Sequence, residues 1–289
     1  MLITLREAFS NVVAFPLGPN ASKAGYRVIG FDSIGSTNAE AMKAAAAGDA
    51  PNIWYVALQQ TEGRGRRGRQ WESPYGNLAA SLMIAPEAEA HHLATLGFVA
   101  GVALNRALNQ LVPQMRTRSG LDGADGVSQE GPVRIALKWP NDILADGAKL
   151  AGILLEVQPR FDGSKAIVIG FGVNVVAAPA GLPYPATALS AFNGALDAQA
   201  VFEALAEHWV ECYALWNNGA GTREILAGWR EFATGIGTEV AVKRNSDVIR
   251  GVFETIDDAG RLIVRDAEGH RTAIAAGDVH FGTTASLKA

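Results

Sequence analysis

A basic, glycine-rich segment set between two apolar runs constrains the fold of this chain more than any other feature. Residues 59–71 read QQTEGRGRRGRQW; they follow the apolar run 53–58 and precede, after a turn rich in Pro, Gly and Asn, the apolar run 78–84. Apolar runs of this length between turn residues predict strands, so the sequence predicts a hairpin whose long loop carries the charge. A Walker-type phosphate loop is excluded, because the GK[ST] ending is absent and a strand follows instead of a helix.

The loop combines fixed positive charge with an accessible backbone. Arg64, Arg66, Arg67 and Arg69 are interspersed with glycines in a chain whose formal net charge is −4. Arginine presents forked donors that suit carboxylates and phosphates, and glycine lets the backbone approach a ligand closely. The pattern favours a site for a small anion, with a solvated basic loop or an arginine-glycine patch for nucleic acid as the alternatives. The acidic chain weighs against general nucleic-acid binding.

Composition excludes several other classes. The chain is 48% hydrophobic and 19% charged, as in ordinary globular proteins. Cys212 is the only cysteine, which excludes an internal disulfide and a cysteine-based zinc site. The first residues lack a basic region followed by a long apolar run, and no later run is long enough to span a membrane. We therefore expect a cytoplasmic protein with no membrane partner.

Periodicity predicts two domains. Helices are predicted at residues 37–47, 91–111, 197–216 and 222–232, and further strands at 26–31, 133–139, 149–157 and 166–171. Five short strands with tight turns are predicted at 239–243, 248–255, 261–264, 271–275 and 279–281, which indicates a small closed or sandwiched β module. The predicted division is a catalytic domain at 1–234 and a C-terminal β-barrel at 235–289. The glycine-rich segment 112–132 predicts a long mobile surface loop.

A cluster of short polar residues stands at the start of the first predicted helix. Thr37 and Glu40 fit a capping box, and Gly48 is a natural stop. In the simplest interpretation Ser36, Thr37 and Asn38 only cap the helix. A helix N-terminus with spare hydroxyl and amide groups also suits a polar ligand.

A third cluster follows the predicted strand 133–139. Lys138 lies out of phase with the apolar row of that strand, so it is either exposed to solvent or directed into a site. Gly152 lies inside the next predicted strand, which it weakens unless another group must approach the backbone there.

Together these clusters resemble the biotin protein ligase family. The resemblance rests on STN at 36–38, QQTEGRGRRGRQW at 59–71, KWPND at 138–142, KLAGIL at 149–154 and GFGVNV at 170–175. It implies an α+β fold of the class II aminoacyl-tRNA synthetase/biotin ligase type, with a mixed, largely antiparallel sheet covered by helices. It also implies a small C-terminal Src-homology-3-like β-barrel.

The resemblance implies a two-step reaction. Biotin attacks the α-phosphate of ATP to give biotinyl-5'-AMP and pyrophosphate, and a lysine of a biotin carboxyl carrier protein then displaces AMP. ATP and biotin are substrates, and Mg²⁺ accompanies the nucleotide. The first step brings one anion up to another, so charge neutralisation and alignment are the main tasks.

The resemblance also implies residue roles. Catalytic roles fall to Arg64, Arg66 and Lys149. Biotin is expected at Ser36, Thr37, Asn38, Gln60, Gly63, Arg64, Arg66, Lys149 and Gly152. The nucleotide is expected at Arg66, Arg67, Trp71, Lys138, Asn141, Asp142 and Asn174, with Asp142 as the metal-linked carboxylate. Trp71 offers a stacking face for adenine, whereas Trp139 is expected to pack in the core.

The sequence departs from the family pattern in places. No DNA-binding domain precedes the catalytic region, so DNA binding is not expected, and a homodimer is an open option. Glu62 places an acid beside the loop arginines, where a small residue is commoner. The last strand shows no arginine for ATP, so we expect no nucleotide contact from the C-terminal domain. A lipoate ligase or lipoyl transferase of the same superfamily and a non-catalytic Arg/Gly binding module are the alternative functions.

Overall fold

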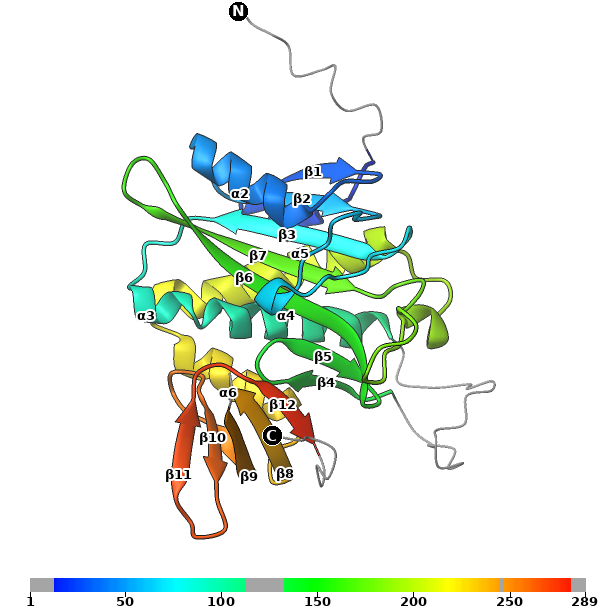
Figure 1. Cartoon of the computed structure of the whole chain (residues 1–289). Helices are drawn as coiled ribbons and strands as arrows, with labels where there is room; N and C mark the ends of the chain where they lie inside the picture. Colours follow the sequence, from blue (N-terminus) through cyan, green and yellow to red (C-terminus); the bar gives the residue numbers. More distant parts are fainter. Residues whose placement is uncertain (1–12, 113–132, 245–246, 282–289) are drawn as a thin grey trace, which may run out of the picture.

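Two β-sheets organise the chain (Figure 1). The computed structural model describes residues 13–112, 133–244 and 247–281, so most of the predicted 112–132 loop lies outside the described residues. The larger sheet has seven strands in the order β1-β2-β3-β7-β6-β5-β4. Only β1 and β2 run parallel, which confirms the mixed, largely antiparallel sheet. The strands are β1 (Arg27–Phe31), β2 (Ile53–Ala57), β3 (Leu78–Ile84), β4 (Ile135–Lys138), β5 (Asp142–Ala145), β6 (Ala148–Pro159) and β7 (Lys165–Val173).

Helices cover both faces of this sheet. The long helices α4 (Leu96–Leu111) and α5 (Ala198–Trp216) lie on one face, and α2 (Thr37–Ala47) lies on the other (Figure 1). Side chains alternate between the faces along each strand. On β2, Trp54 and Val56 join the main core, while Ile53 and Tyr55 join a smaller core beneath α2. The strands β2 and β3 are therefore buried on both faces, which explains why they are apolar apart from Ser81.

The N-cap of the first predicted helix lies one residue earlier than predicted. Ser36 is the N-cap: its hydroxyl accepts from the backbone N–H of Ala39 at 3.4 Å. The capping box of Thr37 and Glu40 was therefore wrong, because Thr37 is already helical and its side chain bonds elsewhere. Gly48 ends the helix at φ 85°, as predicted.

The other helices largely follow their predicted bounds. The predicted helix 91–111 is broken into α3 (Ala90–Leu93) and α4, with the Thr95 hydroxyl bonded to the carbonyl of His92 at the break. Asp197 caps α5 through its side chain, and α6 spans Thr222–Phe232 as predicted. The remaining elements are α1 (Pro19–Lys23) and three short 3-10 turns at Arg66–Gly68, Leu189–Ala191 and Asn217–Gly219. No helix in the described ranges is long and apolar enough to cross a membrane.

The second sheet is small and antiparallel, in the order β11-β10-β9-β8-β12. Its strands are β8 (Glu239–Arg244), β9 (Asp247–Ile256), β10 (Leu262–Arg265), β11 (Arg271–Ile274) and β12 (Asp278–Phe281). It sits beside α6, which contacts β9, and beside β4, whose Lys138 ammonium lies 5.3 Å from the centre of the Phe281 ring on β12 (Figure 1). Two side chains hold it there: the indole N–H of Trp139 donates to the carbonyl of Gly260 at 2.9 Å, and the Arg230 guanidinium donates twice to the carbonyl of Ile256.

Candidate active site

The main cleft opens on the face of the large sheet that carries α2. Beyond the end of that helix the sheet is floored by glycine: Gly152 and Gly172 are register partners on β6 and β7, and Gly170 lies two residues along. Residues 168, 170 and 172 share one face, and Val168 packs beneath α2. Where the apolar packing ends, the missing side chains leave a hollow.

Other side chains occupy the space above these glycines and leave no room for a Cβ. A Cβ at Gly172 would lie 2.4 Å from the Trp71 ring, and one at Gly170 would lie 2.2 Å from Asn38 Oδ1. The ring of Trp71, at the end of the Arg/Gly loop, therefore lies directly against Gly172 and Gly152 of the sheet. At that position Trp71 lines the cleft and can contact a ligand, and it is not packed in the hydrophobic core.

The loop itself is a closed hairpin over the cleft. The backbone N–H of Trp71 donates to the Gly63 carbonyl at 2.9 Å, and that of Gly65 donates to the Arg69 carbonyl at 2.7 Å. A Cβ at Gly63 would lie 2.2 Å from the Trp71 carbonyl, so this closure requires glycine. The predicted strand–loop–strand arrangement is confirmed, since β2 and β3 pair antiparallel on either side of it.

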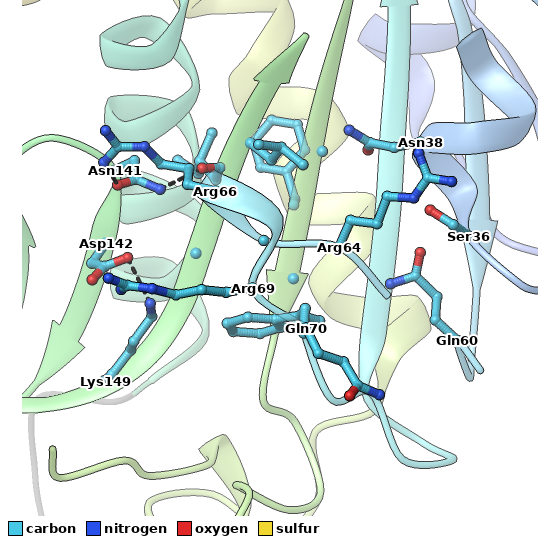
Figure 2. A pocket seen from close by; sticks show the side chains of 18 of the residues that line it. Ser36, Asn38, Gln60, Arg64, Arg66, Arg69, Gln70, Asn141, Asp142 and Lys149 are labelled. Atoms are coloured by element: carbon cyan, nitrogen blue, oxygen red, sulfur yellow. Dashed lines mark hydrogen bonds and ion pairs between the residues drawn. The ribbon is translucent and has the colours of Figure 1, made fainter. Parts of the chain in front are cut away.

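Polar groups line the cleft in two clusters (Figure 2). The first cluster is neutral and sits at the start of α2. Gln60 Oε1 accepts from the Thr37 backbone N–H at 2.8 Å and from its hydroxyl at 3.0 Å. Ser81 Oγ lies 2.7 Å from Thr37 Oγ1 and 2.5 Å from Asn38 Oδ1, and Asn38 donates to Glu156 at 2.7 Å. These bonds fix each side chain before any ligand arrives.

The second cluster is charged and lies across β5 and β6. Lys149 Nζ is 2.8 Å from Asp142 Oδ1, and Arg66 donates to Asn141 Oδ1 at 2.8 Å (Figure 2). Asn141 in turn donates to the Ile153 carbonyl at 2.6 Å, which fixes its orientation. Burial lowers the pKa of Arg66, and neighbouring arginines act in the same direction. A bound anion would relieve this concentration of charge.

Most of the predicted site residues line this cleft. They are Ser36, Thr37, Asn38, Gln60, Arg64, Arg66, Trp71, Asn141, Asp142, Lys149 and Gly152. Four others lie elsewhere. Gly63 and Arg67 line a second hollow on the outer side of the loop. Lys138 is half-buried with its Nζ 5.3 Å from the centre of the Phe281 ring, so the solvent-exposed alternative is wrong, yet it does not line the cleft.

Asn174 borders a small annex of the cleft with Trp71, Lys149 and Tyr184. Its amide N–H donates to the Thr187 carbonyl at 3.1 Å. Its Oδ1 is buried and has no hydrogen-bond partner in the described part of the chain. An unpaired buried acceptor is costly, so this oxygen is suited to a ligand donor.

Some site residues were missed by sequence reasoning. Ser81 was signalled by a lone hydroxyl in the apolar run 78–84, and Gly170 and Gly172 by their alternation within GFGVNV. Tyr184 lies in an irregular segment with no signal; the Lys149 ammonium is 5.5 Å from the centre of its ring. Asp278 reaches the cleft from the second sheet. The C-terminal domain therefore contributes an acidic side chain to the cleft, and the prediction that it makes no nucleotide contact stays a prediction.

Comparison with known proteins agrees with this architecture. Residues 33–174 match the biotin/lipoate A/B protein ligase family, and residues 235–282 match the biotin protein ligase C-terminal domain. Similar sequences include the biotin–[acetyl-CoA-carboxylase] ligase of Paracoccus denitrificans, 36% identical over 86% of this chain and 97% of that protein. The enzyme of that name from Mycobacterium tuberculosis is 33% identical over 85% of each.

A solved structure shares the fold. Biotin protein ligase from Aquifex aeolicus, in complex with biotin and ATP, gives a TM-score of 0.71 at 24% identity, over 89% of this chain and 98% of that one. The fold is thus that of a biotin protein ligase, with a small C-terminal β module. The chain belongs to the biotin/lipoate A/B protein ligase family, and the resemblance seen in its motifs is confirmed.

Proposed function

We propose that this protein is a biotin protein ligase, which forms biotinyl-5'-AMP from biotin and ATP and transfers biotin to a lysine of a biotin carboxyl carrier protein. One observation carries the proposal: a fixed neutral cluster and a cationic cluster share one glycine floor in a chain of this family. The neutral cluster suits an uncharged polar ring, and the cationic cluster suits a carboxylate meeting a phosphate.

Biotin binds with its ureido ring in the neutral cluster. Because Gln60 Oε1 is occupied by Thr37, the Gln60 amide N–H groups are the donors left for a ligand carbonyl. Ser36 and Asn38 add polar groups on the same side. The network fixes these groups in advance, so ligand binding orders few side chains.

The acyl phosphate forms between the clusters. Arg64 lies near the neutral cluster, where biotin is proposed, and Arg66 and Lys149 lie near Asn141 and Asp142 (Figure 2). Their fixed charges neutralise the biotin carboxylate and the α-phosphate as the two approach, and hold them in line. The adenine occupies the annex against Trp71, where Asn174 Oδ1 accepts from its amino group.

Mg²⁺ accompanies the triphosphate and supplies additional charge neutralisation. Within the described residues the cleft is lined by two carboxylates, Asp142 and Asp278, and both already face cations. Asp142 fits the metal-linked role only if Lys149 exchanges its 2.8 Å partner for the acyl phosphate. The donor set is thus compatible with a metal held mainly by phosphate oxygens.

The remaining assignments follow from this function. The carrier protein presents its lysine to the loop side of the cleft, where the Arg/Gly hairpin excludes water from the reactive anhydride. We further propose a division into domains at residues 1–234 and 235–289, a cytoplasmic location and a homodimer.

The test uses purified protein with ATP, Mg²⁺ and either biotin or lipoate, and follows pyrophosphate release. We expect release with biotin, none above background with lipoate, and biotin transfer when a carrier domain is added. Release with lipoate alone would assign the chain to the lipoate branch of the family. Salt-sensitive RNA binding without any adenylate would assign it to the non-catalytic alternative.

A further inference from the structure

An aspartate of the second sheet forms ion pairs with two arginines of the Arg/Gly loop. Asp278, the first residue of β12, accepts from Arg67 Nη1 at 3.0 Å and from Arg69 Nη2 at 2.5 Å, both through Oδ2. More than two hundred residues separate these partners in the chain. Asp278 also lines the main cleft, so the contact lies at its edge.

The loop is shaped for this contact. Arg67 adopts φ 57° and ψ 34°, a left-handed conformation that is uncommon for residues other than glycine, and Gly68 follows at φ 71°. Such a conformation persists only where the surroundings hold it. Among the described residues Asp278 is the one ion-pair partner of Arg67 and of Arg69. The turn and the aspartate therefore act together.

We propose that Asp278 is a positioning residue: through Arg67 and Arg69 it holds the loop hairpin over the cleft and Trp71 against its glycine floor, so that the C-terminal sheet closes the adenylate site without supplying a cation to it. The contact of Asp278 with Arg67 and Arg69, called the tie below, is inferred from the ion pairs alone. Its consequence, retention of the reactive intermediate, rests on the proposed function.

The alternative is an ordinary surface ion pair. Exposed pairs contribute little, and the Arg69 side chain is 65% exposed. Two features argue against that alternative. One carboxylate is shared by two arginines, and its own side chain is only 24% exposed. It also links the second sheet to the loop between β2 and β3, so its loss removes the ion pairs that Arg67 and Arg69 make within the described residues.

Tryptophan fluorescence tests the tie in the free protein. Five of the six tryptophans are buried at 2% exposure or less, whereas Trp71 is partly exposed, so acrylamide quenching reports mainly on the loop. Asp278→Asn removes the charge and keeps the shape; Asp278→Glu keeps the charge. The matched control is Glu254→Gln, which removes a carboxylate that also serves two arginines, Arg265 and Arg271, but within the second sheet.

We expect Asp278→Asn to increase quenching and to speed tryptic cleavage in the loop several-fold, while Glu254→Gln leaves both unchanged and Asp278→Glu restores most of the protection. Thermal unfolding of the three variants separates local release from misfolding. Equal quenching and cleavage in wild type and Asp278→Asn would overturn the tie, whether or not the protein forms an adenylate.

A second measurement tests the consequence. If the wild type forms biotinyl-AMP, Asp278→Asn should release AMP several-fold faster in the absence of carrier protein, because the uncovered anhydride meets water. If the loop is loosened but AMP release is unchanged, the loop does not retain biotinyl-AMP, although the ion pairs of Asp278 still hold the loop in place. Absence of any adenylate in the wild type would count against the proposed function alone.

Discussion

The indole of Trp71 rests on Gly172 with no room for a methyl group between them: a Cβ at position 172 would lie 2.4 Å from the ring. The contact joins the end of the Arg/Gly loop to the centre of the sheet. It explains why a glycine interrupts a strand that is otherwise apolar and buried. The same residue pair sets the depth at which a ligand can sit.

Gly172→Ala should therefore damage the site more than the fold. The added methyl displaces Trp71 and the loop that ends there, and we expect adenylate formation to fall more than tenfold, or at least ~1.4 kcal/mol of transition-state stabilisation. Single-turnover pyrophosphate release measures this. Gly97→Ala is the control, because a Cβ there meets nothing within 4 Å. Equal rates in both variants would show that Trp71 need not lie on the floor.

Arg66→Ala and Lys149→Ala should each lower adenylate formation by well over tenfold, from the loss of at least ~1.4 kcal/mol of charge stabilisation. Lys165→Ala, on the exposed start of β7, should have no effect. Rapid-quench assays of biotinyl-AMP compare the three. Near-normal rates in both site variants would refute their assigned roles.

The unpaired oxygen of Asn174 should select the nucleotide. In the proposed complex its Oδ1 would accept from the adenine amino group, whereas a 6-oxo purine presents a carbonyl there. We expect Asn174→Ala to reduce the preference for ATP over inosine triphosphate by about fivefold, corresponding to roughly 1 kcal/mol for one net hydrogen bond. The ratio of kcat/KM values is the readout, since a general loss of stability would lower both. An unchanged ratio would place adenine elsewhere.

Tyr26 should contribute to stability through one buried bond. The indole N–H of Trp209 donates to its hydroxyl at 2.9 Å, and burial raises the pKa of Tyr26 to about 12, so the phenol is neutral at pH 7. Tyr26→Phe strands the indole donor and should cost about 1–3 kcal/mol in urea unfolding. Tyr75→Phe, at a side chain 57% exposed, should change stability by less than about 0.5 kcal/mol. Similar values for the two variants would contradict this.

The tie of Asp278 to the loop should survive to acidic pH. Burial by itself would raise the pKa of Asp278, but the loop arginines, Arg69 foremost, outweigh it and hold the pKa below its ordinary value of 3.8. A depressed pKa means that the tie is fully present above the unfolded-state value and is lost as pH falls through the folded-state value. His280, beside it, has its pKa lowered by burial and by Lys138, so it is neutral at pH 7.

Quenching of Trp71 should therefore stay low and constant from about pH 8 to about pH 5, then rise below about pH 4 toward the level of Asp278→Asn. The Asp278→Asn variant supplies the baseline for every other group that titrates in this range. A rise centred near pH 6.5 would instead implicate a histidine.

Sequence patterns predicted the fold well where local rules decide it. The bounds of α6 and β3 were predicted to the residue, because apolar phase and turn residues agreed there. The cap at Ser36 was missed by one position, since Ser36 and Thr37 are both good caps and tertiary bonding to Gln60 decides between them. Local propensity cannot express that choice.

The site was predictable only in part. Motifs placed eleven residues that meet in one cleft, because each motif carries its own chemistry. The Asp278 contact had no local signal: an acid at the start of a short strand is ordinary, and only the packing of the second sheet brings it to the loop. Lys138 likewise required the structure, which buries it against Phe281.

The bond from Trp139 to the Gly260 carbonyl has a consequence for how the chain can be divided. Trp139 directly precedes Pro140 and the strand β5 that carries Asp142, and the ring of Phe98 also packs against Gly260. Cutting the chain at residue 234 would expose both aromatic rings and leave the Trp139 indole donor without its partner close to the charged cluster of Asp142 and Lys149. The larger part of the chain therefore depends on the second sheet for its packing, and residues up to 234 should not fold equally well when expressed alone.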